Sequence, residues 1–129
     1  QAGYGSGFRL SMIAPNNRYV NDAKIAQAVV IMLAKINIKV DLVTMPKAQY
    51  WKKYDQASSD LMMLGWHSDT EDSANFSEML AMCRNPDSGY GRYNGGHYCN
   101  PEVDRLVSAS AKQTNLKKRT QMLQQVEQI

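Results

Sequence analysis

The residues with the clearest chemical potential lie in one short segment that follows an apolar run. Trp66 offers a large flat surface with a single N–H donor, and Asp69 offers a carboxylate three positions later. Together they suit an ammonium group, because the carboxylate supplies the opposite charge and the indole supplies apolar or cation–π contact. The alternative is a core tryptophan at a strand end, followed by an aspartate that serves a turn or a helix cap.

A second chemistry uses the histidine beside Trp66. His67 with Asp69 and Glu71 or Asp72 contains the residue types of a small metal-dependent hydrolase. The acids do not follow the spacing of an EF-hand loop, and the chain has no G-x-S-x-G, H-E-x-x-H or phosphate-loop motif. We therefore expect no catalytic residue, no bound metal and no cofactor, and the hydrolase is the alternative function.

Two cysteines, Cys83 and Cys99, enclose a segment of about 17 residues. A disulfide closing such a segment would stabilise the fold by about 3 kcal/mol in the loop-entropy model, and would indicate an oxidising compartment. The sequence favours this pairing. Free thiols, or zinc bound with His67 and His97, are the alternatives.

Length and composition are those of an ordinary globular chain. Of 129 residues, 43% are hydrophobic and 21% charged, and no apolar run approaches the roughly 20 residues of a membrane-spanning helix. The net charge of +3 is too small to indicate a nucleic-acid partner. Residues 60–87 nevertheless hold six acids and one base, a pattern typical of a solvated loop or of a surface that meets a cationic group.

Periodicity in the first half predicts alternating strands and helices. Strands are expected over residues 8–14 and 38–44 and at the apolar run 61–64 within residues 60–66, with a helix after Asn21 and another after Pro46. The expected apolar face of the first helix is Ile25, Val29, Met32 and Ile36. This order predicts a parallel α/β sheet, which binds ligands at the carboxyl ends of its strands.

The second half is predicted to be mostly helical. We expect a short helix over residues 74–83, a long loop over 84–98, and a helix capped by Asn100. A last helix begins at Thr114 or Asn115, with its apolar positions at Leu116, Met122, Leu123 and Val126.

Several short motifs occur in a characteristic order along the chain. They are Ala-Pro-Asn-Asn-Arg-Tyr at 14–19, Lys-Ile-Asn-Ile-Lys-Val at 35–40, Thr-Met-Pro-Lys-Ala-Gln-Tyr at 44–50, Gly65-Trp66 followed by Asp69, and Tyr-Cys-Asn-Pro-Glu-Val-Asp at 98–104. In this order the chain resembles extracellular solute-binding proteins of the peptide/nickel family (family 5). Members of that family are the periplasmic components of ABC importers.

The resemblance implies a fold and a domain organisation. The fold would be a three-layer lobe of the periplasmic-binding-protein type, with a mostly parallel sheet flanked by helices. Residues 1–129 would form a single domain, a fragment of the C-terminal lobe of a two-lobed protein that closes over its ligand and whose N-terminal lobe is missing here. The start at Gln1 and the end within a helix agree with that expectation.

The resemblance also implies a site and a role. Asp69 would pair with the α-ammonium of a short peptide or a similar amine-bearing solute, and Trp66 would line the cleft. Further ligand contacts are expected from Gly65, His67, Tyr90, Tyr93 and Asn94. Cysteine pairs around this loop occur in some family members, which supports a disulfide between Cys83 and Cys99.

The implied function is therefore binding without catalysis. The protein would act in the periplasm, or outside the cell at the membrane, and would deliver its solute to an ABC permease in the inner membrane. No nucleic acid is expected as a partner. Nickel, haem, sugar and opine binders share this fold, so the ligand class stays open. An interaction surface built on the tyrosines of the long loop is a further alternative.

Overall fold

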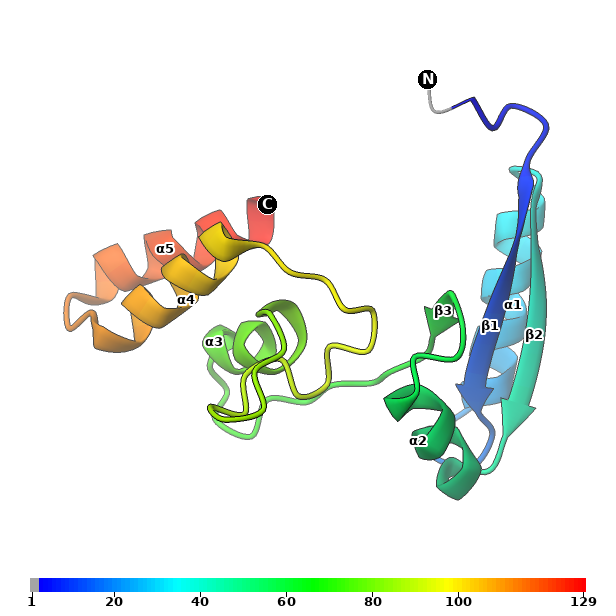
Figure 1. The fold of residues 1–129 in the computed structure, drawn as a ribbon, viewed down its shortest axis with the longest axis horizontal. Helices are drawn as coiled ribbons and strands as arrows, with labels where there is room; N and C mark the ends of the chain where they lie inside the picture. Colours follow the sequence, from blue (N-terminus) through cyan, green and yellow to red (C-terminus); the bar gives the residue numbers. More distant parts are fainter. Residues whose placement is uncertain (1–2) are drawn as a thin grey trace. The chain divides into compact units, whose positions relative to one another are not determined.

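The computed structural model describes residues 3–129, and Gln1 lies outside the described residues. The chain forms two compact units, Gln1–Gly65 and Trp66–Ile129. Among the described residues, every strand lies in the first unit, and the second unit is helical (Figure 1). That residues 1–129 belong to one domain of a larger protein stays a prediction.

The first unit is built on a parallel sheet. Its strands are β1 (Phe8–Pro15), β2 (Ile38–Met45) and β3 (Leu61–Met62), in the order β2-β1-β3. β1 pairs with β2 over its whole length, from Phe8 opposite Ile38 to Pro15 opposite Met45. The predicted parallel α/β sheet is confirmed.

Two helices cover the two faces of this sheet. β1 alternates its side chains, so Met12 and Ala14 pack with Ala26 of α1 (Asp22–Ala34). Ile13 points to the other face and packs with Tyr50 of α2 (Lys47–Asp55). The result is the three-layer arrangement that the sequence predicts, and Figure 1 shows α1 running alongside the two long strands.

The predicted apolar face of α1 is correct at Val29, which packs against the buried cluster of the sheet, and wrong at its other three positions. Ile25, Met32 and Ile36 are exposed, whereas Ala26 is completely buried and Asp22 is 97% buried. A small alanine lets the helix approach the sheet closely, so the buried stripe passes through Ala26 and not through the larger side chains.

The start of α1 also differs from the prediction, because Asn21 makes no capping hydrogen bond with its side chain. The Asp22 carboxylate instead accepts hydrogen bonds from the backbone N–H groups of Arg18, Tyr19 and Ala23. Burial alone would raise the pKa of Asp22, but these three donors outweigh it, and the pKa lies below its usual value. The carboxylate therefore fixes the loop that leads from β1 into the helix.

The third strand is shorter than the apolar run 61–64 from which it is predicted. Only Leu61 and Met62 pair with β1, opposite Met12 and Ile13. Asp60 begins this strand by accepting hydrogen bonds from the Ser11 N–H and hydroxyl, at 2.8 and 2.7 Å. These hydrogen bonds lower the pKa of Asp60.

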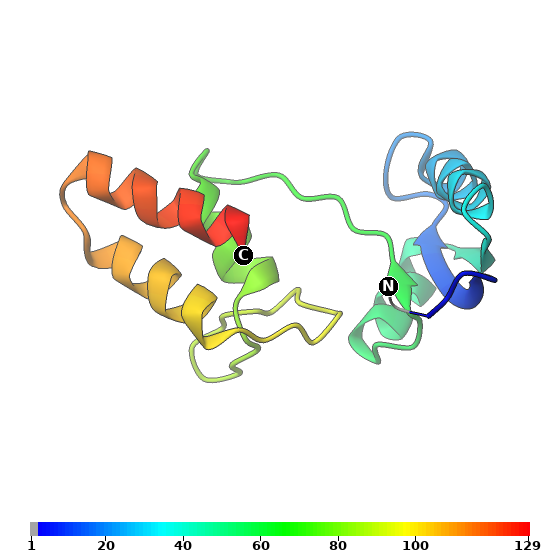
Figure 2. The ribbon, with the colours of Figure 1, turned by 90° about the horizontal axis from the view of Figure 1, so that it is seen from above.

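The second unit packs its helices around a separate core. α3 (Ser73–Phe76) continues into a π-helical turn, η1 (Ser77–Ala81), and the chain ends with α4 (Pro101–Lys112) and α5 (Leu116–Gln128). Figure 2 shows α4 and α5 side by side and antiparallel. The buried core residues come from η1's end, α4 and α5: Met82, Val103, Leu106, Val107 and Val126.

The helix starts predicted at Asn100 and at Asn115 are confirmed, unlike the cap at Asn21. Asn100 accepts a hydrogen bond from the Glu102 N–H at the start of α4, and Asn115 accepts one from the Lys118 N–H at the start of α5. Leu123 and Val126 are buried as expected, whereas Leu116, in the first turn of α5, is exposed.

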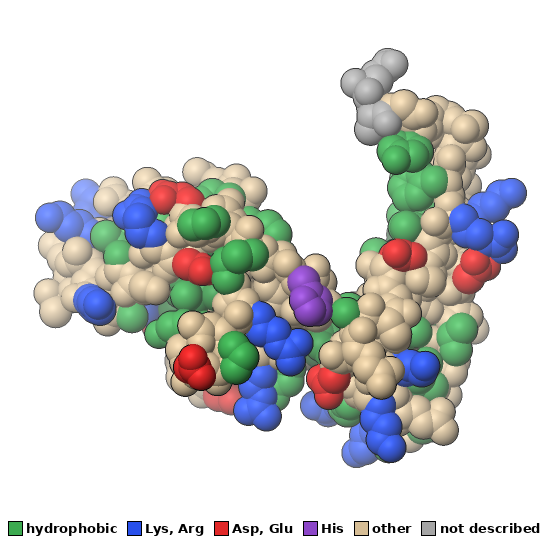
Figure 3. Space-filling model, viewed as in Figure 1, with side chains coloured by type: hydrophobic (Ala, Val, Ile, Leu, Met, Phe, Trp, Pro, Cys, Tyr) green, Lys and Arg blue, Asp and Glu red, His purple; other side chains and the backbone are tan. Residues whose placement is uncertain are grey.

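Apolar side chains also reach the surface in the first unit (Figure 3). Near the start of β1, the rings of Tyr4 and Phe8 lie 5.2 Å apart, and both residues are exposed. Tyr50 has the opposite environment: it is completely buried, its hydroxyl donates to the Met63 carbonyl, and burial raises the pKa of its phenol.

This contrast gives a test of the first core. Tyr50→Phe removes the donor to the buried Met63 carbonyl, so the free energy of unfolding should fall by about 1–3 kcal/mol. Tyr4→Phe, at an exposed ring, is the matched control and should change it by less than about 0.5 kcal/mol. Urea unfolding measures both, and equal stabilities of the two variants would contradict the assignment.

Candidate ligand-binding site

The loops after the three strands meet at one edge of the first unit, as expected for parallel strands. The Asn16 N–H donates to the Met45 carbonyl, and the Lys47 N–H donates to the Asn17 side chain at 2.8 Å. On the other side, the Tyr19 hydroxyl donates to the Gly65 carbonyl at 3.3 Å. The loops after β1 and β2 and the segment after β3 up to Gly65 therefore lie together, and ligand binding at this edge stays a prediction.

Gly65 lies close against the Tyr19 ring at this edge. A Cβ atom on residue 65 would lie 2.9 Å from Cε1 of the Tyr19 ring, closer than carbon atoms approach without displacement. Gly65 is exposed and belongs to the first unit, whereas the other predicted site residues belong to the second.

Trp66 opens the second unit and is half-buried. Its Nε1–H donates to the Asn75 side chain at 3.1 Å, and its ring centroid lies 5.3 Å from that of Tyr93, with the planes tilted by 56°. The structure therefore joins two predicted site residues into one aromatic pair. Asn75 lies in α3 and was not singled out from the sequence.

Asp69 occupies a tight turn after Trp66. The Glu71 N–H donates to the Ser68 carbonyl, so Asp69 and Thr70 are the two central residues of the turn. Asp69 is exposed, and its carboxylate makes no hydrogen bond or ion pair with any residue in the range 3–129. His67 is exposed on the same loop. The Asp69 carboxylate is thus accessible to a ligand.

Asp72 serves the structure of the site. One carboxylate oxygen accepts from the Ala74 N–H at 2.9 Å and caps α3, and the other lies 2.8 Å from a guanidinium nitrogen of Arg119 on α5. These hydrogen bonds, the one from Ala74 first, lower the pKa of Asp72 despite its partial burial. Sequence reasoning missed Arg119, although Arg119, Leu123 and Val126 share one face of a helix by their spacing.

The acidic stretch is therefore not a single ligand-facing surface. Asp60 binds Ser11 within the first unit, and Asp72 binds Arg119 within the second. A surface of this stretch that meets a cationic group therefore does not include the carboxylates of these two acids, because folding uses both. Asp69 and Glu71 are the acids of residues 66–72 that keep exposed carboxylates without a hydrogen bond or ion pair among the described residues.

The long loop is closed by a disulfide between Cys83 and Cys99, with an S–S distance of 2.02 Å. The predicted pairing is present, and the free-thiol and zinc alternatives for these cysteines do not apply. Within residues 3–129, no group of three or more His, Cys, Asp and Glu side chains is arranged to hold a metal ion. The metal-dependent hydrolase therefore has no support in the geometry.

Asn94 closes the same loop a second time. It is 96% buried, its side-chain amide donates to the carbonyls of Met82 and Tyr98 at 2.9 and 2.6 Å, and it accepts from the Tyr98 N–H. Met82 and Tyr98 are the residues immediately before the two cysteines. Asn94 thus organises the loop from inside, and the half-buried Tyr90 packs against the α4–α5 core.

The comparisons with known proteins agree with this geometry. Residues 1–88 match the family model described as bacterial extracellular solute-binding proteins, family 5 Middle. The match covers most of the chain, and the chain belongs to this family.

Individual relatives are peptide- and haem-binding proteins by name. "Di/tripeptide-binding protein 3" of Pseudomonas aeruginosa is 30% identical over 132 residues, covering all of this chain and 24% of that protein. "Heme-binding protein A" of Haemophilus influenzae is 29% identical, over all of this chain and 23% of that protein. The crystal structure of a dipeptide binding protein from Pseudoalteromonas sp. SM9913, in complex with Met-Leu, has a TM-score of 0.82 and 28% identity, covering 97% of this chain and 25% of that chain.

The chain spans about a quarter of the length of these relatives. The periplasmic-binding-protein fold is shared with them, and the family is one of extracellular solute-binding proteins. None of the helices in the described part of the chain has the length and apolar character required to cross a membrane.

The loop organisation predicts a stability effect at Asn94. Asn94→Ala leaves the buried Met82 carbonyl and the partly buried Tyr98 carbonyl without their donor, so the free energy of unfolding should fall by about 2–4 kcal/mol even with the disulfide intact. Asp87→Ala, at an exposed position of the same loop, is the control and should have little effect. Thermal unfolding under non-reducing conditions measures both, and an unchanged midpoint for Asn94→Ala would show that the disulfide alone maintains the loop.

Proposed function

We propose that this chain is part of the C-terminal lobe of the solute-binding component of an ABC importer. The protein binds a short peptide or a similar amine-bearing solute in the periplasm and delivers it to a permease in the inner membrane. It acts by binding and catalyses no reaction. The observation that carries the proposal is the accessible, unpartnered Asp69 carboxylate, held in a defined turn after the Trp66–Tyr93 aromatic pair.

The chemistry of the turn favours an ammonium ligand. A peptide α-ammonium presents three N–H donors and a positive charge, which an exposed carboxylate accepts as charge-assisted hydrogen bonds. Asp72 is already paired with Arg119, which leaves Asp69 and Glu71 as the free carboxylates of this loop, and Asp69 lies nearer in sequence to Trp66 of the aromatic pair. Trp66 and Tyr93 supply flat surfaces for the neighbouring side chain or the cation itself.

The names of the relatives support a peptide as the first ligand to test. Two of the three comparisons describe peptide-binding proteins, and one of these was crystallised with Met-Leu. A haem-binding relative of similar identity shows that this family of sequences also serves a ligand of another class. A peptide carries a free amino group that can pair with Asp69, and haem does not.

The proposal includes the missing part of the binding cleft. Family members of the implied type enclose the solute between two lobes, and the aligned region is about a quarter of each relative. Gly65 and His67, which flank Trp66 and are both exposed, and the loop residue Tyr93 are proposed as additional cleft contacts. Tyr90 and Asn94 are proposed to contribute through the shape of the loop, since both pack within it or against the core.

Asp69→Asn tests the ammonium role in the full-length protein. The substitution keeps the size of the side chain and removes its charge, so the affinity for Met-Leu should fall by about 1.5–3 kcal/mol, or roughly 10- to 150-fold in Kd. Asp87→Asn, an exposed acid of the same unit, is the matched control and should leave Kd unchanged. Isothermal titration calorimetry measures both.

The ligand specificity gives a second readout of the same variant. N-acetyl-Met-Leu lacks the charged amine, so Asp69→Asn should weaken Met-Leu and leave the acetylated peptide unaffected. If Asp69→Asn binds Met-Leu as tightly as the wild type, Asp69 is not the ammonium partner.

A further inference from the structure

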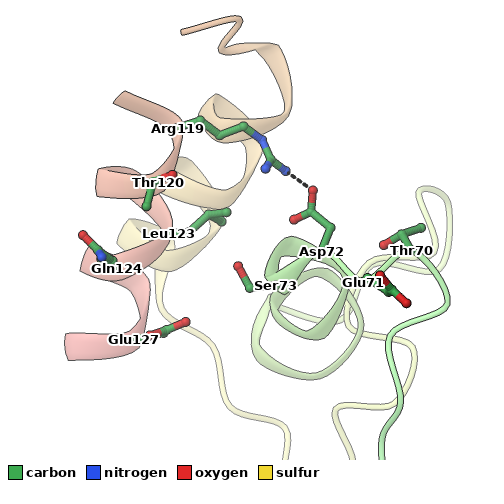
Figure 4. Close-up of a pocket in the computed structure, with 9 residues that line it drawn as sticks. All are labelled: Thr70, Glu71, Asp72, Ser73, Arg119, Thr120, Leu123, Gln124 and Glu127. Carbon is green, nitrogen blue, oxygen red and sulfur yellow. Dashed lines mark ion pairs between the residues drawn. The ribbon is translucent and has the colours of Figure 1, made fainter. Parts of the chain in front are cut away.

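The loop that carries Asp69 is tied to a distant helix by one ion pair. Arg119 of α5 lies 47 positions from Asp72 in sequence, and their side chains meet at 2.8 Å (Figure 4). We infer that Arg119 is a positioning residue for Asp69, which acts through Asp72 and the turn that follows Trp66. The inference rests on the proposed function of Asp69 and extends it to a residue outside the matched range 1–88.

The position of Arg119 on α5 is fixed by the packing of this helix. Leu123 and Val126, one and two turns further along α5, are buried against the core of the second unit. Arg119 lies on the same helical face, so packing of these two side chains sets where its guanidinium points. The pair with Asp72 is only 25% and 35% exposed, compared with 62% and 51% for the surface pair between Arg105 and Glu102.

Asp72 links Arg119 to the turn that carries Asp69. One carboxylate oxygen faces Arg119 and the other accepts from the Ala74 N–H, so the side chain is held from two directions. The Asp72 carbonyl in turn accepts a hydrogen bond from the Ser68 hydroxyl at 3.1 Å. The restraint therefore passes from α5 to the residue that begins the turn.

The turn of residues 68–71 contains a strained residue and is stabilised by the anchoring of Asp72. Ser68 closes the turn through its carbonyl, which accepts from the Glu71 N–H, and its hydroxyl lies 3.3 Å from that of Thr70. Glu71 adopts a left-handed backbone conformation, with φ of 55°, which a residue with a Cβ adopts only at a cost. Asp72 immediately follows this strained residue, so its anchoring holds the turn in place.

Apolar packing between residues 70–73 and α5 is sparse beside the ion pair. A polar hollow of about 500 Å³ lies between residues 70–73 and α5, and Figure 4 shows Arg119 reaching across its upper end to Asp72. Most of the side chains that line it are polar: Thr70, Glu71, Thr120, Gln124 and Glu127. The contact between the turn and α5 at this end therefore depends on the charge pair.

A mutant cycle with Asp69 tests the inference, with Met-Leu as the probe and the full-length protein as the sample. In the wild-type background, Arg119→Met should weaken binding by about three- to tenfold. In the Asp69→Asn background the same substitution should change Kd by less than about twofold, because the group it positions has lost its charge. Arg119→Lys, which keeps a cation at the position, should restore part of the affinity.

Two further variants control the cycle. Arg105→Met removes the exposed pair on α4 and should leave Kd unchanged in both backgrounds. Asp72→Asn keeps an oxygen for the Ala74 N–H while removing the charge that pairs with Arg119, and it should reproduce the effect of Arg119→Met. If Arg119→Met does not give a cooperative thermal transition, Asp72→Asn serves in the cycle in its place.

Each outcome has a definite meaning. An equal loss of affinity from Arg119→Met in both backgrounds, or no loss in either, overturns the positioning role. If Asp69→Asn alone leaves Met-Leu binding intact, the ammonium role of Asp69 fails and the inference fails with it. If Asp69→Asn weakens binding as expected while Arg119→Met does not, only the inference fails, so the two failures are distinguishable.

Discussion

The candidate site depends on how the partly buried carboxylate of Asp72 is held. Asp72 is shared by three parts of the second unit: it caps α3 through Ala74, pairs with Arg119 of α5, and accepts from Ser68 through its carbonyl. Because these partners use both oxygens of its side chain, Asp72 is committed to the fold. Asp69, three residues earlier, keeps its carboxylate exposed. Neighbouring acids of the same type thus have different roles, and the difference comes from their partners rather than from their sequence context.

Much of the first unit could be predicted because its signals are local. The alternation in β1 and β2 gives their extents to within a residue, and Asn37, just after α1, adopts the left-handed conformation that asparagine tolerates at helix ends, with φ of 63°. The buried face of α1 could not be predicted, because apolar periodicity gives most weight to large side chains, whereas the sheet selects the small Ala26. β3 is shorter than its apolar run because only two of its residues pair with β1.

The residue types of the candidate site could be predicted from the sequence, but their contacts could be predicted only in part. Trp66, Asp69 and Tyr93 are residue types that a reader of the sequence can select, and the paired rings and exposed carboxylate agree with that selection. The structural use of Asn94 and the Arg119–Asp72 pair could not be found in this way, since each depends on contacts that only the folded chain forms. Asn94 illustrates the difficulty well, because a polar residue in a Gly-rich loop has the same sequence signature whether it binds a ligand or the loop itself.

The central claim is that Asp69 receives the amino group of a peptide. The most direct measurement is a crystal structure of the full-length protein with Met-Leu bound. The account predicts the peptide nitrogen at a hydrogen-bonding distance of about 2.7–3.1 Å from an Asp69 oxygen, with the first side chain near Trp66 and Tyr93. A complex in which the amino group is held by another residue, with Asp69 facing solvent, would contradict it.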